Sequence, residues 1–328
     1  MATLVIDRSN LEVRSDGAAL SIYEGGERRG SVPLKLLDRV VLQGTIRLDT
    51  GVLTRLAEAG VPTVLLGGRS SRRMAMLLGP AHRDASVRLA QFQSALDPSW
   101  CDAWSRRLIA GKTRGQLKLL RAALAERPDA RKSLFDAIKT IEDGLHSIVE
   151  MPDLAAASVR GIEGACAAAH FRGLAALFAE NLGFKGRNRR PPRDPVNAAL
   201  SLAYTLLHFD AVRASHAAGL DPLVGFYHRP AHGRESLASD LIEPLRPRAD
   251  GWVRSMFRDR TLRAENFTLD KGACLLGKAG REGFYAGYET FALLPRRWLR
   301  RQCAVLAKAL RTKGEPLLDD TEARELES

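Results

Sequence analysis

Two acidic residues in the C-terminal half of the sequence are spaced so that they could share a cation. Asp240 and Glu243 lie three positions apart, on one face of a helix that we expect to begin at Ser236. Carboxylates at that spacing repel each other unless a cation or a proton lies between them. Pro244 has no N–H, so the segment predicts a kink or a helix end beside the pair. The alternative is two exposed acids on an ordinary surface helix.

A third carboxylate, Glu163, lies within an alanine-rich helix that we expect over residues 152–182, the longest in the chain. An acid on such an apolar face is costly to bury unless it is paired or binds a metal. The small residues around it allow a neighbouring helix to approach and to bring the Asp240/Glu243 pair close. A set of carboxylates with one histidine favours Mg²⁺ or Mn²⁺ over zinc or copper.

Two histidines precede the acidic pair. His228 and His232 are four residues apart, but Pro230 between them argues against a shared helix face. This spacing alone is a weak zinc signal, and the sequence has no HExxH. Each histidine is equally compatible with a partly buried structural role.

A polar stripe runs along the helix expected over residues 195–218. It consists of Asn197, Ser201, Tyr204 and His208, on a helix whose other faces are alanine and leucine. Buried polar side chains need partners. The stripe therefore either supports the same site or forms a network between helices.

Positive charge is concentrated in the larger, C-terminal part. The chain has 50 Lys and Arg against 38 Asp and Glu, a net charge of +12, which favours a polyanionic partner such as nucleic acid. A proline-rich segment before residue 195 cannot be a helix interior. We expect it to be a loop that contacts DNA phosphates through Lys185, Arg187, Arg189, Arg190 and Arg193, the alternative being a solvated linker.

The hydrophobic pattern predicts an α+β protein with two domains. Residues 1–80 show short strands at 11–14, 20–23, 39–43 and 61–66 and one helix at 50–59, whereas residues 81–328 follow a helical period. We expect helices at 84–96, 98–126, 130–148, 152–182, 195–218, 236–248 and 284–312.

Other features limit the class of protein. The longest mainly apolar stretch has about ten residues, against roughly 20 for a membrane span. The four cysteines form no CxxC pair, which argues against a disulfide scaffold and fits a reducing compartment. We therefore expect a cytoplasmic protein without a signal peptide or a membrane partner.

Three sequence blocks, in this order and spacing, resemble the CRISPR-associated endonuclease/integrase family that inserts new spacers, written Cas-one. They are GIEG around Glu163, RRPPRDPVNAALSLAYTLL over 189–207, and GFYH…GRESLASDLIEPLRP over 225–247. The resemblance covers most of residues 155–290. One residue departs from it, because His170 replaces the tyrosine usual in the family seven residues after the motif glutamate. His170 could act as a fourth ligand or as a titrating neighbour.

The resemblance implies a β-rich N-terminal dimerisation domain and an all-helical catalytic domain. It also implies one Mg²⁺ or Mn²⁺ ion held by Glu163, His228 and Glu243, with Asp240 beside them, and Asn197, Tyr204 and His170 become candidates to support this catalytic site. In the implied reaction, the 3′-OH of a double-stranded spacer precursor attacks a phosphodiester at the CRISPR repeat. The implied partners are a second copy of the chain and a small Cas-two protein, in a hetero-hexamer. Two interpretations compete: a non-catalytic nucleic-acid-binding protein with a structural metal, and a resolvase-like junction nuclease.

Overall fold

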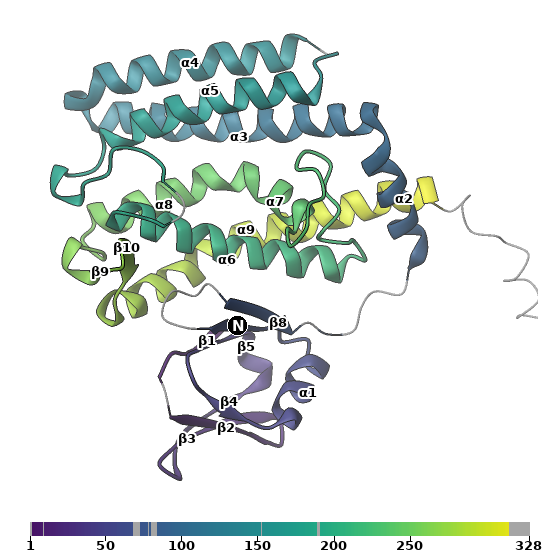
Figure 1. The fold of residues 1–328 in the computed structure, drawn as a ribbon, viewed down its shortest axis with the longest axis vertical. Coiled ribbons are helices and arrows are strands. Elements are labelled where there is room, and N and C mark those ends of the chain that lie inside the picture. The colour runs from purple at the N-terminus through teal and green to yellow at the C-terminus, as the bar shows by residue number, and fades with distance from the viewer. Residues whose placement is uncertain are drawn as a thin grey trace, which may run out of the picture. The chain divides into compact units, whose positions relative to one another are not determined.

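The computed structural model describes residues 2–8, 10–67, 73–77, 79, 84–151, 153–188 and 191–314. The chain divides into two compact units, Met1–His82 and Arg83–Ser328. The first unit is rich in strands and the second is mainly helical, which confirms the predicted α+β class (Figure 1). No helix in the described part of the chain is long and apolar enough to cross a membrane.

The first unit contains two four-stranded sheets and one helix. One sheet has the order β4 (Glu27–Pro33), β3 (Ala19–Glu24), β2 (Leu11–Asp16) and β6 (Arg47–Leu48). The other has the order β1 (Ala2–Ile6), β5 (Leu37–Gln43), β7 (Thr63–Gly67) and β8 (Arg73–Leu77). Helix α1 (Thr50–Glu58) begins where the Asp49 carboxylate accepts a hydrogen bond from the Val52 amide at 2.9 Å. The four strands and the helix expected here are all confirmed.

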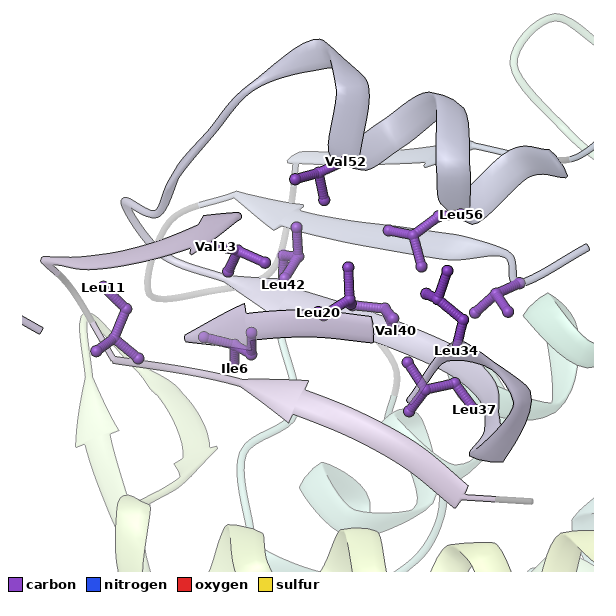
Figure 2. Close-up of a cluster of buried hydrophobic side chains, with 11 residues drawn as sticks. Ile6, Leu11, Val13, Leu20, Leu34, Leu37, Val40, Leu42, Val52 and Leu56 are labelled. Atoms are coloured by element: carbon purple, nitrogen blue, oxygen red, sulfur yellow. The ribbon is translucent and has the colours of Figure 1, made fainter. Parts of the chain in front are cut away.

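The core of this unit follows from the alternation of side chains along its strands. Val13 and Leu20 on β2 and β3 are buried, as are Val40 and Leu42 on β5. Helix α1 adds Leu56 from its apolar face, and these aliphatic side chains pack into one cluster (Figure 2). Burial of such side chains is the main force that stabilises a unit of this size.

Eight helices and one hairpin make up the described part of the second unit. The helices are α2 (Ala85–Leu96), α3 (Pro98–Glu126), α4 (Arg131–Glu150), α5 (Ala156–Ala175), α6 (Pro195–Ala217), α7 (Ser236–Ile242), α8 (Arg246–Arg258) and α9 (Lys278–Gly314). Helices α3, α4 and α5 pack side by side as one group, and α6 packs against α7, α8 and α9 (Figure 1). Asp97 and Asp194 cap α3 and α6, each directly before a proline at the first helical position.

Three helix predictions need correction. The helix expected over residues 152–182 is shorter, because α5 begins only after the extended Ala155, and the chain leaves it at Ala176 to bury Leu177 and Phe184. The longest helix is instead α9, with 37 residues. The helix expected over 236–248 is interrupted at Pro244, as its missing N–H predicts, by a short 3₁₀ turn at Glu243–Leu245.

The helical unit also contains a hairpin that the sequence pattern did not predict. Strands β9 (Phe267–Asp270) and β10 (Ala273–Leu276) pair antiparallel. Each strand has only four residues, too few for its alternation to be distinguished from a loop. Gly272, at a φ of 77°, completes the turn between them.

Candidate metal centre

Asp240 organises the loop that carries His228. Its side chain is fully buried on α7, and its carboxylate accepts hydrogen bonds from the backbone amides of Phe226, Tyr227 and His228 at 2.8–2.9 Å. The loop passes so close to α7 that a Cβ on Gly225 would lie 2.6 Å from the carbonyl carbon of Ser236. Glycine is therefore required there, and the loop is fixed by one buried carboxylate.

The same carboxylate sets the orientation of the His228 ring. His228 Nδ1 lies 2.7 Å from Asp240 Oδ1. Because this carboxylate already accepts three amide hydrogens, Nδ1 acts as the donor and Nε2 keeps its lone pair. Nε2 lies 4.0 Å from Glu243 Oε1, so the free nitrogen faces the second acid of the pair.

Glu243 lies in the 3₁₀ turn after α7 and is almost completely buried. Its carboxylate contacts Lys112 Nζ at 2.6 Å and Arg246 Nε at 3.0 Å. Burial raises the pKa of Glu243, but Arg246 and Lys112 lower it further than burial raises it, to about 2. Glu243 is therefore a carboxylate near neutral pH.

Glu163 reaches the same place from α5. Its Oε1 accepts a hydrogen bond from Lys112 Nζ, the ammonium that also contacts Glu243. The acid expected to be paired or metal-bound on an apolar face is thus paired in this structure. Lys112 joins two carboxylates that are 80 residues apart in the sequence.

Lys112 is a site residue that the sequence analysis missed. It is buried on α3, where burial lowers its pKa but the charges of Glu243 and Glu163 raise it more. Two glycines explain how α3 packs so closely against the segment around Glu243. A Cβ on Gly115 would lie 3.2 Å from Pro247, and one on Gly111 would lie 3.6 Å from the side chain of Pro244. The motif GKTRG contains this signal, since its glycines recur four residues apart on one helix face.

The donor set has the right chemistry for a hard divalent cation. Two carboxylates contact the Lys112 ammonium, and one of them faces an imidazole nitrogen: the 4.0 Å between His228 Nε2 and Glu243 Oε1 can be spanned by one ion with bonds of about 2 Å. As they stand, the residues described in the structure contain no group of three or more His, Cys, Asp or Glu side chains that could hold a metal ion. The metal assignment to Glu163, His228 and Glu243 therefore stays a prediction.

The three residues expected to support the site belong to two neighbouring networks. Tyr204 Oη and His170 Nε2 both bond to the buried carboxylate of Asp250, the latter at 2.8 Å. Tyr204 also lies 4.7 Å below the guanidinium of Arg246, which contacts Glu243, so it is one residue away from the acidic pair. Asn197 acts elsewhere.

Asn197 holds the start of the basic loop against α6. Its amide donates to the Gly186 carbonyl at 2.8 Å, and its oxygen accepts a bond from Arg187 Nη1 at 2.8 Å. Arg187 also donates to Ser201, so its guanidinium is directed towards α6. Lys185 and Arg193 are exposed, whereas Arg189 and Arg190 lie outside the described residues. The phosphate contacts expected of this loop stay a prediction.

The two histidines of the loop differ in their surroundings. His228 is mostly buried and held by Asp240, whereas His232 is exposed, beside Gly233 at a φ of 67°. His228 is thus the one directed towards the carboxylates.

Comparison with known proteins gives a consistent family. The family model described as "CRISPR associated protein Cas1" matches residues 4–290. The chain is 38% identical over 307 residues to "CRISPR-associated endonuclease Cas1 1" of Thermodesulfovibrio yellowstonii, covering 92% of each. It is 34% identical to "CRISPR-associated endonuclease Cas1 2" of Rhodospirillum rubrum, covering 88% of this chain and 85% of the relative.

Solved structures share the fold at low identity. A casposase bound to its integration product has a TM-score of 0.82 at 20% identity, with 95% of this chain and 91% of that chain covered. A Cas1 protein from Thermotoga maritima has a TM-score of 0.78 at 16% identity, with 94% and 96% covered. A Cas6-RT-Cas1–Cas2 complex has a TM-score of 0.78 at 21% identity, with 95% of this chain and 35% of the solved chain covered.

Proposed function

The chain belongs to the CRISPR associated protein Cas1 family, and on that basis we propose that it is a metal-dependent DNA endonuclease and integrase that inserts new spacers into a CRISPR array. The relatives at 38% and 34% identity are named endonucleases, and the casposase with the same fold is bound to an integration product. Nuclease and integrase activity are both phosphoryl transfers at a phosphodiester, so one site can perform both.

One observation carries the proposal. Asp240 fixes the loop and the ring of His228, so that Nε2 faces the buried carboxylate of Glu243, and Lys112 brings Glu163 to the same carboxylate. A tautomer fixed by a hydrogen bond from the second ring nitrogen is typical of metal-ligating histidines. Glu163, His228 and Glu243 are the residues that would hold Mg²⁺ or Mn²⁺, and Asp240 would position His228.

Each of these residues has a defined role in the proposed reaction. The ion, when bound, polarises the phosphodiester and stabilises the charge on the leaving oxygen. Asp240 keeps the proton on His228 Nδ1, so that Nε2 faces the acidic pair. Arg246, which contacts Glu243 and lies over Tyr204, adds positive charge beside the site for the anionic DNA backbone. The attacking group is the 3′-OH of the incoming DNA.

The proposal includes the partners that this activity requires. The substrate is double-stranded DNA, both the spacer precursor and the repeat, held in part by the basic loop at 185–193. A solved complex with the same fold contains Cas1 and Cas2, and we extend this partnership to the present chain. The expected assembly is a homodimer joined through the strand-rich unit, with two such dimers around a Cas2 dimer.

A strand-transfer assay tests the function. Labelled spacer precursor is incubated with a plasmid that carries a CRISPR repeat and with Mg²⁺, Mn²⁺ or EDTA, with and without Cas2. Joined product should require a divalent ion and should be lost in Glu163→Ala while DNA binding is kept. Equal product in EDTA would contradict the metal mechanism. Cleavage of branched DNA without joining would favour the junction nuclease, and DNA binding without either activity would favour a non-catalytic protein.

A further inference from the structure

Lys112 places a positive charge directly against the two carboxylates, Glu163 and Glu243, that would hold a metal ion. Its Nζ contacts Glu163 Oε1 and Glu243 Oε2, and its side chain is only 9% exposed. A divalent ion held by these two carboxylates would lie a few ångströms from a buried ammonium, and at such distances the repulsion is strong. If the metal binds there, the Lys112 ammonium must therefore move to a second position.

A small cavity next to Lys112 offers that place. It has a volume of about 20 Å³, and its lining includes Lys112, Gln116, Glu163 and His170. This volume exceeds the roughly 10–15 Å³ that a single water molecule needs. Lys112 and Gln116 are four residues apart on α3 and so lie on the same face of the helix.

Two of the side chains that line this cavity have a buried atom without a hydrogen-bond partner among the described residues: Gln116 Oε1 and His170 Nδ1. Both side chains are at least 98% buried. His170 Nε2 lies 2.8 Å from Asp250 Oδ2, which accepts its hydrogen, so in the neutral ring Nδ1 is the nitrogen with the lone pair. Buried acceptors without donors are costly. The two atoms therefore mark a position for a donor, and an ammonium has three hydrogens to offer.

We propose that Lys112 is a positioning residue with two places: it holds Glu163 and Glu243 together before a divalent cation binds, and its ammonium then moves to Gln116 Oε1 and His170 Nδ1. Lys112, Gln116 and His170 line the same small cavity, and the long lysine side chain can change its position by a change of rotamer. This inference rests on the proposed metal site. His170, whose tyrosine counterpart is usual in the family, then accepts a hydrogen bond from the displaced lysine and is not a ligand.

The proposal predicts opposite effects on Mn²⁺ affinity for substitutions of Lys112 and of Gln116. Lys112→Met removes the competing charge and should tighten Mn²⁺ binding about tenfold or more, because no charge-assisted bonds have to be broken. Gln116→Leu removes an acceptor that Lys112 needs only after metal binding, and it should weaken Mn²⁺ binding about tenfold. In the Lys112→Met background, Gln116→Leu should change the affinity less than twofold.

The experiment is titration calorimetry of the full-length protein with MnCl₂, in the wild type, the two single variants and the double variant. Lys118→Met, an exposed lysine on the same helix, serves as the matched control and should leave the Mn²⁺ affinity unchanged. Circular dichroism reports whether each variant folds. If Lys112→Met does not fold, Lys112→Gln replaces it, with the same expectation. Gln116→Leu in the wild-type background tests whether the Lys112 ammonium uses the second position, beside Gln116, when Mn²⁺ is bound.

The outcomes separate this inference from the proposed function. Wild-type protein that binds no Mn²⁺, or that binds it equally tightly after Glu163→Gln, overturns the metal site and the inference with it. Mn²⁺ binding that depends on Glu163 but is not tightened by the loss of Lys112 overturns the inference alone. The inference alone is also overturned if Gln116→Leu leaves the Mn²⁺ affinity of the wild type unchanged, or if it weakens Mn²⁺ binding equally in the wild-type and Lys112→Met backgrounds. In either case the cavity holds water and not Lys112.

Discussion

Replacing Asp240 with asparagine should lower the free energy of unfolding of the helical unit and should misorient His228. The carboxylate accepts four hydrogen bonds, two on each oxygen, from three backbone amides and from His228 Nδ1. Asparagine has one oxygen and one NH₂ group, so two of these donors lose their acceptor and point at another donor. The new NH₂ group also favours the His228 tautomer with its proton on Nε2, which would block that nitrogen for a metal.

The cost can be estimated from these contacts. A hydrogen bond to a charged group contributes about 1.5–3 kcal/mol, so the loss of two amounts to about 3–6 kcal/mol before relaxation. Water can reach part of this loop, because the His228 side chain is 20% exposed. We therefore expect the free energy of unfolding to fall by about 3 kcal/mol, a large part of the 5–15 kcal/mol typical of a protein domain.

Urea unfolding followed by tryptophan fluorescence measures the stability of the helical unit, which contains Asp240. All four tryptophans lie after residue 83. Trp100 and Trp104 have their rings 5.9 and 5.1 Å from that of Phe226, in the loop that Asp240 holds. Asp259→Asn, an exposed acid at the end of α8, is the matched control and should change the stability by less than about 0.5 kcal/mol. If Asp240→Asn shifts the midpoint no more than the control does, the account of this loop is wrong.

Three further predictions concern the same site. His228→Ala should abolish strand transfer and Mn²⁺ binding while DNA binding is kept, whereas His232→Ala should cost little; equal damage in the strand-transfer assay would refute the choice of ligand. Gly225→Ala should lower the unfolding free energy by about 1–3 kcal/mol in urea, because its Cβ would lie 2.6 Å from the backbone of Ser236. Glu243 has a pKa of about 2 against an ordinary value of 4.5. Since its folded pKa is the lower one, it stabilises the fold above pH 4.5, and up to about 3 kcal/mol should be lost as the pH falls towards 2. Acid titration of unfolding should show this loss in the wild type and not in Glu243→Gln.

Local sequence patterns predicted much of the fold. Apolar patterns predicted four strands and the one helix of the first unit, and the helical period predicted α3 and α6, which the structure shows to be capped by Asp97 and Asp194. The end of α5 was not predicted, because the burial of Leu177 and Phe184 after Ala176 is a tertiary effect with no local signal.

The candidate site was predicted in part. The Asp240/Glu243 pair beside Pro244 and the acid at position 163 stood out because carboxylates in such contexts are costly without a partner. Lys112 did not stand out, since a lysine among the basic residues of α3 resembles a solvated side chain. Its burial depends on the contact between the α3 glycines and the prolines that follow α7, which are more than 120 residues away in the sequence.

The position of the metal ion tests the central claim most directly. Crystals of the wild-type protein grown with MnCl₂ would be measured at the manganese absorption edge, where the ion alone gives a strong anomalous signal. The account predicts one peak bounded by Glu163, His228 Nε2 and Glu243, with bonds of about 2.0–2.3 Å. A peak ligated by other residues, or the absence of a peak at these three side chains in protein that binds Mn²⁺ in solution, would contradict it.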